Sequence, residues 1–352
     1  MRISAYIFLL IGLTLISCEE NFLLEENTNT QFNVRINDVE LPVLVRGNTA
    51  SKKIILFVND GPGLPILDHA HIDLMNFKDI ESSFAIAYFD QRGTGNAQGV
   101  INKGSLTLKQ YNEDIFDIIR VLEAKYDQPD IFIMSHGFGS YLSSFFLLSY
   151  EDSNSVKGWI NLDGNLLIQE STVWEYKHTF LVNIAVEEIG LGNNIAHWTD
   201  ALDWSANNPT ISKQAQKDQW RSYLGNPSEF IIPSEQRDLL TREAFDIIFT
   251  SSYNPFPALW SRNYKITAER ISEEVNGTNL IPELSRLTLP TLNIWGRYDD
   301  IIPPELGEDI YDAIGTPSAD KYFEVLLNSG HQPFENEPSL VSQKVVDFVG
   351  KY

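Results

Sequence analysis

The stretch IFIMSHGFGSYL, residues 131–142, passes from a continuously apolar run through several small residues into a second, helix-like segment. Apolar runs without alternation are typical of strands that are covered on both faces, as in parallel sheets. Gly137 and Gly139 mark a tight turn between the two segments. We therefore expect a strand, a sharp turn and a helix, which is the repeating unit of an α/β protein.

Similar strand-like runs occur along most of the chain. IILFV, FAIAYF and LNIW are apolar throughout, whereas the first two runs alternate and predict an antiparallel edge. Between Thr107 and Tyr126 apolar residues recur at three- and four-residue spacing, and Thr107 and Gln110 are placed as a capping box, so a crossover helix is expected. The predicted strands are 32–36, 39–46, 53–58, 84–89, 131–135, 157–162, 291–295 and 321–327.

The alternation of strands and helices stops after about Asn165 and resumes near Leu289. The stretch 166–286 has helical periodicity and predicts a helical cap inserted into a core formed by 31–165 and 287–352. Large aromatic rings in this stretch either line a ligand pocket or form the core of the cap, and the core is the favoured interpretation. The tryptophans concerned are Trp174, Trp198, Trp204, Trp220 and Trp260.

The N-terminal residues 1–17 combine a basic residue with a short apolar run and predict a signal peptide. The tetrapeptide LISC, ending at Cys18, resembles the lipobox of bacterial lipoproteins, and Cys18 is the single cysteine of the chain. This resemblance implies a lipid on Cys18, and ordinary secretion with cleavage nearby is the alternative. Residues 18–30 contain several glutamates and no basic residue, so they predict a solvated acidic tether.

The composition restricts the choice of partners. The 352 residues carry 26 Lys+Arg against 48 Asp+Glu, a formal net charge of -22 at pH 7. Because such a surface repels phosphate, nucleic acid is not expected as a partner. The expected partners are a small-molecule or peptide ligand under the cap and a membrane reached through a lipid on Cys18. That lipid predicts a lipid-anchored protein of the bacterial cell envelope, on the periplasmic or the cell-surface face; neither a cofactor nor a metal is expected.

Five short motifs follow predicted strands: NDGPG (59–63), DQRGTG (90–95), SHGFGS (135–140), GRYDD (296–300) and SGH (329–331). Together they resemble the α/β-hydrolase superfamily, and the GPG loop paired with DQRG is most similar to the proline iminopeptidase (prolyl aminopeptidase) branch. The resemblance implies an α/β-hydrolase fold, with a mostly parallel central sheet of about eight strands and an inserted helical cap. It also implies a serine hydrolase or aminopeptidase.

The resemblance also assigns roles to single residues. The family holds its nucleophile at the centre of a small-x-nucleophile-x-small turn, and that position is occupied by Gly137, preceded by His136. Shifting the frame to Ser135 or Ser140 would put a large residue at a small position or bury the nucleophile in the helix. The family's histidine and acid correspond to His331 and Asp299, which we interpret as a remnant dyad. Alternative acids are Asp300 and Asp163.

The backbone donors of the family's oxyanion hole would come from Gly61 and Phe138. Asp60 stands where the family has a glycine, and two orientations of its side chain remain open. Pointing inward, the carboxylate would repel a developing oxyanion; pointing outward, it would be a turn residue. Asp90 and Arg92 in the DQRG motif are expected to form an acid–arginine pair that braces the floor of the site.

These residues favour a noncatalytic protein that binds a ligand in a capped pocket, because glycine has no side chain that can attack a substrate. An alternative is a serine-independent hydrolase or lyase in which His331, oriented by Asp299, activates water. A further alternative is a structural accessory lipoprotein. Aminopeptidase specificity would need cap carboxylates that read a free amine, and spacing selects none among Glu175, Glu187 and Glu188.

Overall fold

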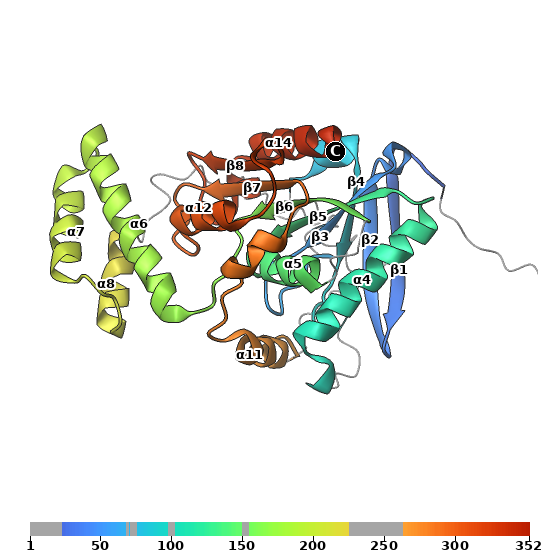
Figure 1. The fold of residues 1–352 in the computed structure, drawn as a ribbon, viewed down its shortest axis with the longest axis horizontal. Helices are drawn as coiled ribbons and strands as arrows, with labels where there is room; N and C mark the ends of the chain where they lie inside the picture. Colours follow the sequence, from blue (N-terminus) through green and yellow to red (C-terminus); the bar gives the residue numbers. More distant parts are fainter. Residues whose placement is uncertain (1–22, 68–69, 71–75, 98–102, 150–154, 225–262) are drawn as a thin grey trace, which may run out of the picture.

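The computed structural model describes residues 23–67, 70, 76–97, 103–149, 155–224 and 263–352. Its centre is an eight-stranded sheet with the order β1-β2-β4-β3-β5-β6-β7-β8 (Figure 1). β1 and β2 pair antiparallel with each other, and β2 pairs antiparallel with β4, whereas the pairs from β4 to β8 are parallel. The strands are β1 (Thr28–Ile36), β2 (Val39–Gly47), β3 (Lys53–Val58), β4 (Ala85–Phe89), β5 (Asp130–His136), β6 (Val156–Leu162), β7 (Thr291–Gly296) and β8 (Lys321–Leu326).

The continuous apolar runs are explained by burial on both faces of the sheet. In β3, Ile54, Leu56 and Val58 belong to one apolar cluster, while Ile55 and Phe57 belong to another on the opposite face. The first cluster is completed by α4 (Leu108–Lys125), α5 (Phe138–Ser149) and α12 (Pro304–Ala313); the second is completed by α3 (Lys78–Ser83), α13 (Pro333–Asn336) and α14 (Pro338–Lys351). The sheet therefore lies between two layers of helices, as the sequence predicted.

The predicted crossover helix is present as α4. The Thr107 side chain accepts a hydrogen bond from the Gln110 amide at 3.2 Å, so the first half of the capping box is confirmed. The reciprocal half differs, because the Gln110 side chain bonds Asn37 and Asp114 instead. The Gln110 side chain that would have completed the capping box thus forms a tertiary contact with Asn37.

The folded body begins earlier than predicted. β1 starts at Thr28, and Glu25 bonds Thr49 through its backbone, so the acidic tether does not extend to residue 30. The reason is that Thr28 to Thr30 pair with β2 through backbone groups, which need no apolar side chains. The predicted signal peptide and Cys18 lie outside the described residues. No helix in the described ranges is long and apolar enough to span a membrane.

Of the described helices from the predicted cap, α6, α7 and α8 stand apart from the sheet, whereas α11 packs into the same apolar cluster as the sheet. Figure 1 shows α6 (Glu170–Leu191), α7 (Ile195–Asn207) and α8 (Gln214–Leu224) at one end of the molecule, and α11 (Asn263–Val275) beside the sheet's helical layer. α6, α7 and α8 share an apolar cluster of their own that contains Trp174, Trp198 and Trp220. These rings thus contribute to a core, the interpretation that the sequence favoured, and Trp204 packs against it. Trp260 lies outside the described residues.

Candidate functional site

The turn between β5 and α5 is shaped by glycines. Gly137 has a φ of +52°, in the left-handed region that a glycine adopts without strain, and its N–H donates to the Leu162 carbonyl at 3.1 Å. A Cβ on Gly139 would lie 2.1 Å from the Val58 carbonyl oxygen. The start of α5 therefore packs directly on the end of β3, which explains why small residues surround this turn.

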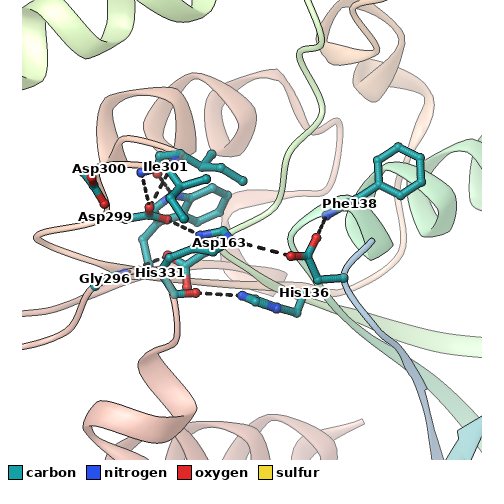
Figure 2. A network of polar contacts seen from close by, with 12 residues as sticks. His136, Phe138, Asp163, Gly296, Asp299, Asp300, Ile301 and His331 are labelled. Atoms are coloured by element: carbon teal, nitrogen blue, oxygen red, sulfur yellow. Dashed lines mark hydrogen bonds and ion pairs between the residues drawn. The ribbon is translucent and has the colours of Figure 1, made fainter. Parts of the chain in front are cut away.

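Two residues that lie 32 positions apart meet beside this turn (Figure 2). His331, after β8, contacts Asp299, after β7, with 2.8 Å between Nδ1 and Oδ2. The other Asp299 oxygen accepts the backbone N–H groups of Ile301 and Ile302 at 2.8 and 2.9 Å, and the side chain is fully buried. These three contacts hold the carboxylate and the imidazole in one orientation.

The alternative acids occupy other positions. Asp163 is fully buried and accepts the Gly296 N–H at 2.9 Å, and burial, followed by the charge of Asp299, raises its pKa well above the usual value. Asp300 contributes its backbone carbonyl, which accepts a hydrogen bond from Lys177 of α6 at 2.7 Å. Of the three acids, Asp299 is the one that bonds His331.

The two histidines of the site have opposite charge preferences. Burial disfavours the charged form of His331, but the charge and the hydrogen bond of Asp299, followed by the charges of Asp163 and Asp60, raise its pKa to about 9. Burial, with the nearby charge of His331, lowers the pKa of His136 to about 4. Neutral His136 therefore donates from Nε2 to the His331 carbonyl at 2.7 Å, as Figure 2 shows. At neutral pH His331 is the charged ring, and His136 supports its backbone.

The Asp60 side chain points inward, which decides between the two predicted orientations. Its Oδ1 accepts the Phe138 N–H at 2.7 Å, and its Oδ2 lies 4.0 Å from His331 Nε2. A Cβ built on Gly137 would lie 2.3 Å from Asp60 Oδ1. The carboxylate therefore fills the space in which a side chain at position 137 would begin.

This position changes what the predicted oxyanion donors can do. The Phe138 N–H already binds a negative group, and a Cβ on Gly61 would lie 3.8 Å from the Phe138 ring, so the loop and the start of α5 adjoin. Two like charges about 5 Å apart at an effective dielectric near 20 repel by about 3 kcal/mol. This repulsion would raise the free energy of an oxyanion formed here by about 3 kcal/mol, which lowers the reaction rate roughly a hundredfold.

The hydroxyls next to the turn are not placed as substitutes for a nucleophile. Ser135 and Ser140 are fully buried, with their Oγ atoms 3.0 Å apart, and Trp159 Nε1 donates to Ser135 Oγ at 2.8 Å. In the described part of the chain, no group of three or more His, Cys, Asp or Glu side chains is arranged to hold a metal ion.

Comparison with known proteins identifies the family. A sequence model of the α/β hydrolase fold family matches residues 69–338. The chain belongs to the α/β-hydrolase fold family. The fold class and the family that the motifs predicted are therefore confirmed.

Individual relatives cover nearly the whole chain of this α/β-hydrolase. It is 20% identical over 307 residues to the probable aminopeptidase YbaC of Bacillus subtilis strain 168, which covers 87% of this chain and 91% of that protein. The solved structure of proline iminopeptidase from Mycobacterium smegmatis is similar with a TM-score of 0.60 at 13% identity, covering 92% of this chain and 98% of that one. The esterase EaEST from Exiguobacterium antarcticum has a TM-score of 0.56 at 14% identity, covering 92% and 100%. At these identities the likeness shows the fold.

The prediction that Arg92 pairs with Asp90 was wrong. Arg92 Nε and Nη2 donate to the two carboxylate oxygens of Asp114 on α4 at 2.9 and 2.5 Å, and both side chains are buried. Asp90 instead accepts the backbone N–H groups of Ile66, Leu67 and Asn96. Side chains at neighbouring positions of a tight turn point in different directions. Asp90 therefore hydrogen-bonds the backbone of nearby loops, and Asp114 forms the ion pair with Arg92. A signal for Asp114 was available, because it lies on the apolar face of the predicted helix.

The cap is fastened to the loop that carries Asp299. Arg297 pairs with Glu187 and lies 3.7 Å from Glu188, and the Tyr298 hydroxyl donates to Glu188 at 3.1 Å. Sequence reasoning had selected neither Arg297 nor Tyr298. Two of the three cap carboxylates considered for recognition of a free amine therefore bind this chain's own side chains.

The third carboxylate, Glu175, lines a separate cavity within the cap. This cavity of about 290 Å³ is bordered by α6, α8 and the segment 209–212, with Trp174 and Lys217 among its walls. Its lining includes none of His331, Asp299, Asp60 and Phe138. The cavity is a feature of the cap and does not belong to the site at the end of the sheet.

Proposed function

We propose that this protein is an envelope lipoprotein whose α/β-hydrolase site binds a ligand and does not turn over esters or amides through an acyl-enzyme. The observation that carries the proposal is the position of the Asp60 carboxylate. It lies 2.7 Å from the Phe138 amide nitrogen and overlaps the place where a Cβ of residue 137 would lie.

Three requirements of serine hydrolysis are unmet at this site. Gly137 offers no nucleophile, the Phe138 N–H is occupied, and His331, with a pKa of about 9, already carries the proton that a general base would have to accept. In serine proteases, loss of the nucleophile alone costs about 2 × 10⁶ in turnover. The combined changes are expected to abolish acyl transfer.

The test measures hydrolysis of chromogenic acyl esters and aminoacyl amides, including prolyl amides, by the purified full-length chain. The variants are Gly137→Ser, Asp60→Gly, the double variant Gly137→Ser/Asp60→Gly, and that double variant with His331→Ala. We expect turnover from the double variant alone, because a serine at 137 needs the space and the amide that Asp60 now occupies. Adding His331→Ala should remove it.

One result would contradict the proposal, and a second would contradict the role that it assigns to Asp60. Turnover by the native chain that disappears in His331→Ala would establish catalysis without a serine. If the folded double variant Gly137→Ser/Asp60→Gly shows no turnover, the site does not retain the hydrolase arrangement around Asp60.

A second candidate is a serine-independent hydrolase or lyase, and the observation that favours it is the intact contact of 2.8 Å between His331 and Asp299. In that mechanism His331 would take a proton from water, which requires the neutral ring. With a pKa of about 9 the neutral ring is scarce at pH 7, so this candidate predicts a rate that rises toward pH 9.

A further inference from the structure

The site already holds a carboxylate, and its contacts show how one is bound. Asp60 Oδ1 accepts the Phe138 N–H at 2.7 Å, the bond length of a charge-assisted hydrogen bond. That amide is the first of the 12-residue helix α5, whose N-terminus favours a negative group. The second carboxylate oxygen faces His331 Nε2.

The fit of Asp60 is incomplete on the histidine side. The 4.0 Å between Oδ2 and His331 Nε2 is too long for a hydrogen bond. The other ring nitrogen is committed to Asp299 at 2.8 Å, so the ring cannot turn toward Asp60 without losing that contact. A carboxylate that approached without a tether could satisfy the amide and the ring together.

Asp60 is also placed so that it can leave. Its side chain is 27% exposed, whereas Asp299 is fully buried. Exchange for an outside carboxylate conserves the charge of the site, since one carboxylate replaces another. Binding beside a retained Asp60 would instead place two like charges in contact.

We propose that Asp60 is a tethered occupant of an anion site formed by the Phe138 N–H and His331 Nε2, and that the ligand of this protein is an organic carboxylate that displaces it. This inference rests on the proposed ligand-binding function. Because Asp60 competes from within the chain at a high effective concentration, removing it should strengthen carboxylate binding at least tenfold.

The experiment titrates benzoate and butyrate, with benzamide and butyramide as neutral counterparts, into the full-length chain labelled with ¹⁵N-phenylalanine. The readouts are the Phe138 amide resonance and the melting temperature. The variants are Asp60→Gly, Asp60→Ala, and Asp60→Gly with His331→Ala. Asp38→Gly is the matched control, because it is the same substitution and removes the same charge, from a side chain that is 97% exposed.

We expect benzoate or butyrate to bind Asp60→Gly and Asp60→Ala at least tenfold more tightly than the native chain and Asp38→Gly, and to shift the Phe138 resonance. His331→Ala should reverse this gain. The inference is overturned if the Asp60 variants bind the acids no better than the native chain, if the amides bind equally well, or if the gain survives His331→Ala. Hydrolysis of the ester panel by the native chain would overturn the proposed function. That assay contains none of the acids or amides titrated here, so the two failures can be told apart.

Discussion

At the scale of single residues, Gly137 and Asp60 form a matched pair. The carboxylate occupies the space that any larger residue at 137 would need, with 2.3 Å between Oδ1 and the position of a Cβ. Residues in such contact are expected to respond to mutation nonadditively. We therefore expect a serine at position 137 to fit without strain only when Asp60 is also replaced.

The charge state of His331 provides a prediction at the same scale. Its pKa is raised from 6.5 to about 9, so the imidazolium stabilises the fold fully below pH 6.5, and this stabilisation is lost as the pH rises through 9. The shift corresponds to about 3 kcal/mol at most. We expect a His331 ring resonance that titrates near 9 in the native chain and at a lower pH in Asp60→Gly. Titration of the native ring at or below 6.5 would contradict the assignment of charge.

At the scale of helices and strands, the cap has a core that is separate from the two sheet faces. Trp198 and Trp220 belong to this cluster and are almost completely buried. The links from α6 to the Asp299 loop run through Arg297, Tyr298 and Lys177. Damage to the cap core should therefore loosen the cap first and disturb the sheet less.

Trp198→Ala tests this separation. Removing a buried tryptophan costs about 3–5 kcal/mol, and we expect the loss to appear locally. Amide hydrogen exchange in α6, α7 and α8 should accelerate at least tenfold, while exchange in β3 and β5 stays near the native rate. Leu191→Ala, at a side chain that is 62% exposed, is the control and should change neither region. Equal acceleration in the sheet would show that cap and sheet unfold as one unit.

At the scale of the whole molecule, a lipid on Cys18 would hold the folded body close to a membrane. Because Glu25 already bonds Thr49, seven residue steps separate the cysteine from the fold, which is about 25 Å of extended chain. The strong negative charge of the protein, -22 for the full chain before the predicted signal peptide with Arg2 is removed, would then lie near an interface that is often anionic. The lipid, and not surface charge, would have to supply the attachment.

Metabolic labelling with an alkyne fatty acid tests the anchor. The native chain expressed in a bacterium should take up the label and sediment with membranes, and Cys18→Ser should lose both properties, with labelling reduced to background. Ser17→Ala is the matched control, since it keeps a small residue before the cysteine. Equal membrane recovery of Cys18→Ser would rule out the lipid as the anchor.

Much of this protein could be predicted from its sequence, because the deciding signals are local. Apolar runs such as IILFV specify buried strands, glycines mark the turn at Gly137, and five motifs in order specify the family. Through that resemblance, the sequence also predicted that His331 and Asp299 form a pair. Local signals failed at β1, where Thr28 joins the sheet through backbone pairing with β2 and a side-chain hydrogen bond to Thr49.

The tertiary structure decided what depends on direction and on distant partners. The inward turn of Asp60, the pairing of Arg92 with Asp114 and the fastening of Arg297 to the cap join residues that are far apart along the chain. Periodicity identifies which face of an element is buried but not which polar group it meets there. The side chain of Asp60 could point either way from its loop. The Phe138 amide, the charge of His331 and the absence of a side chain at Gly137 together favour the inward direction.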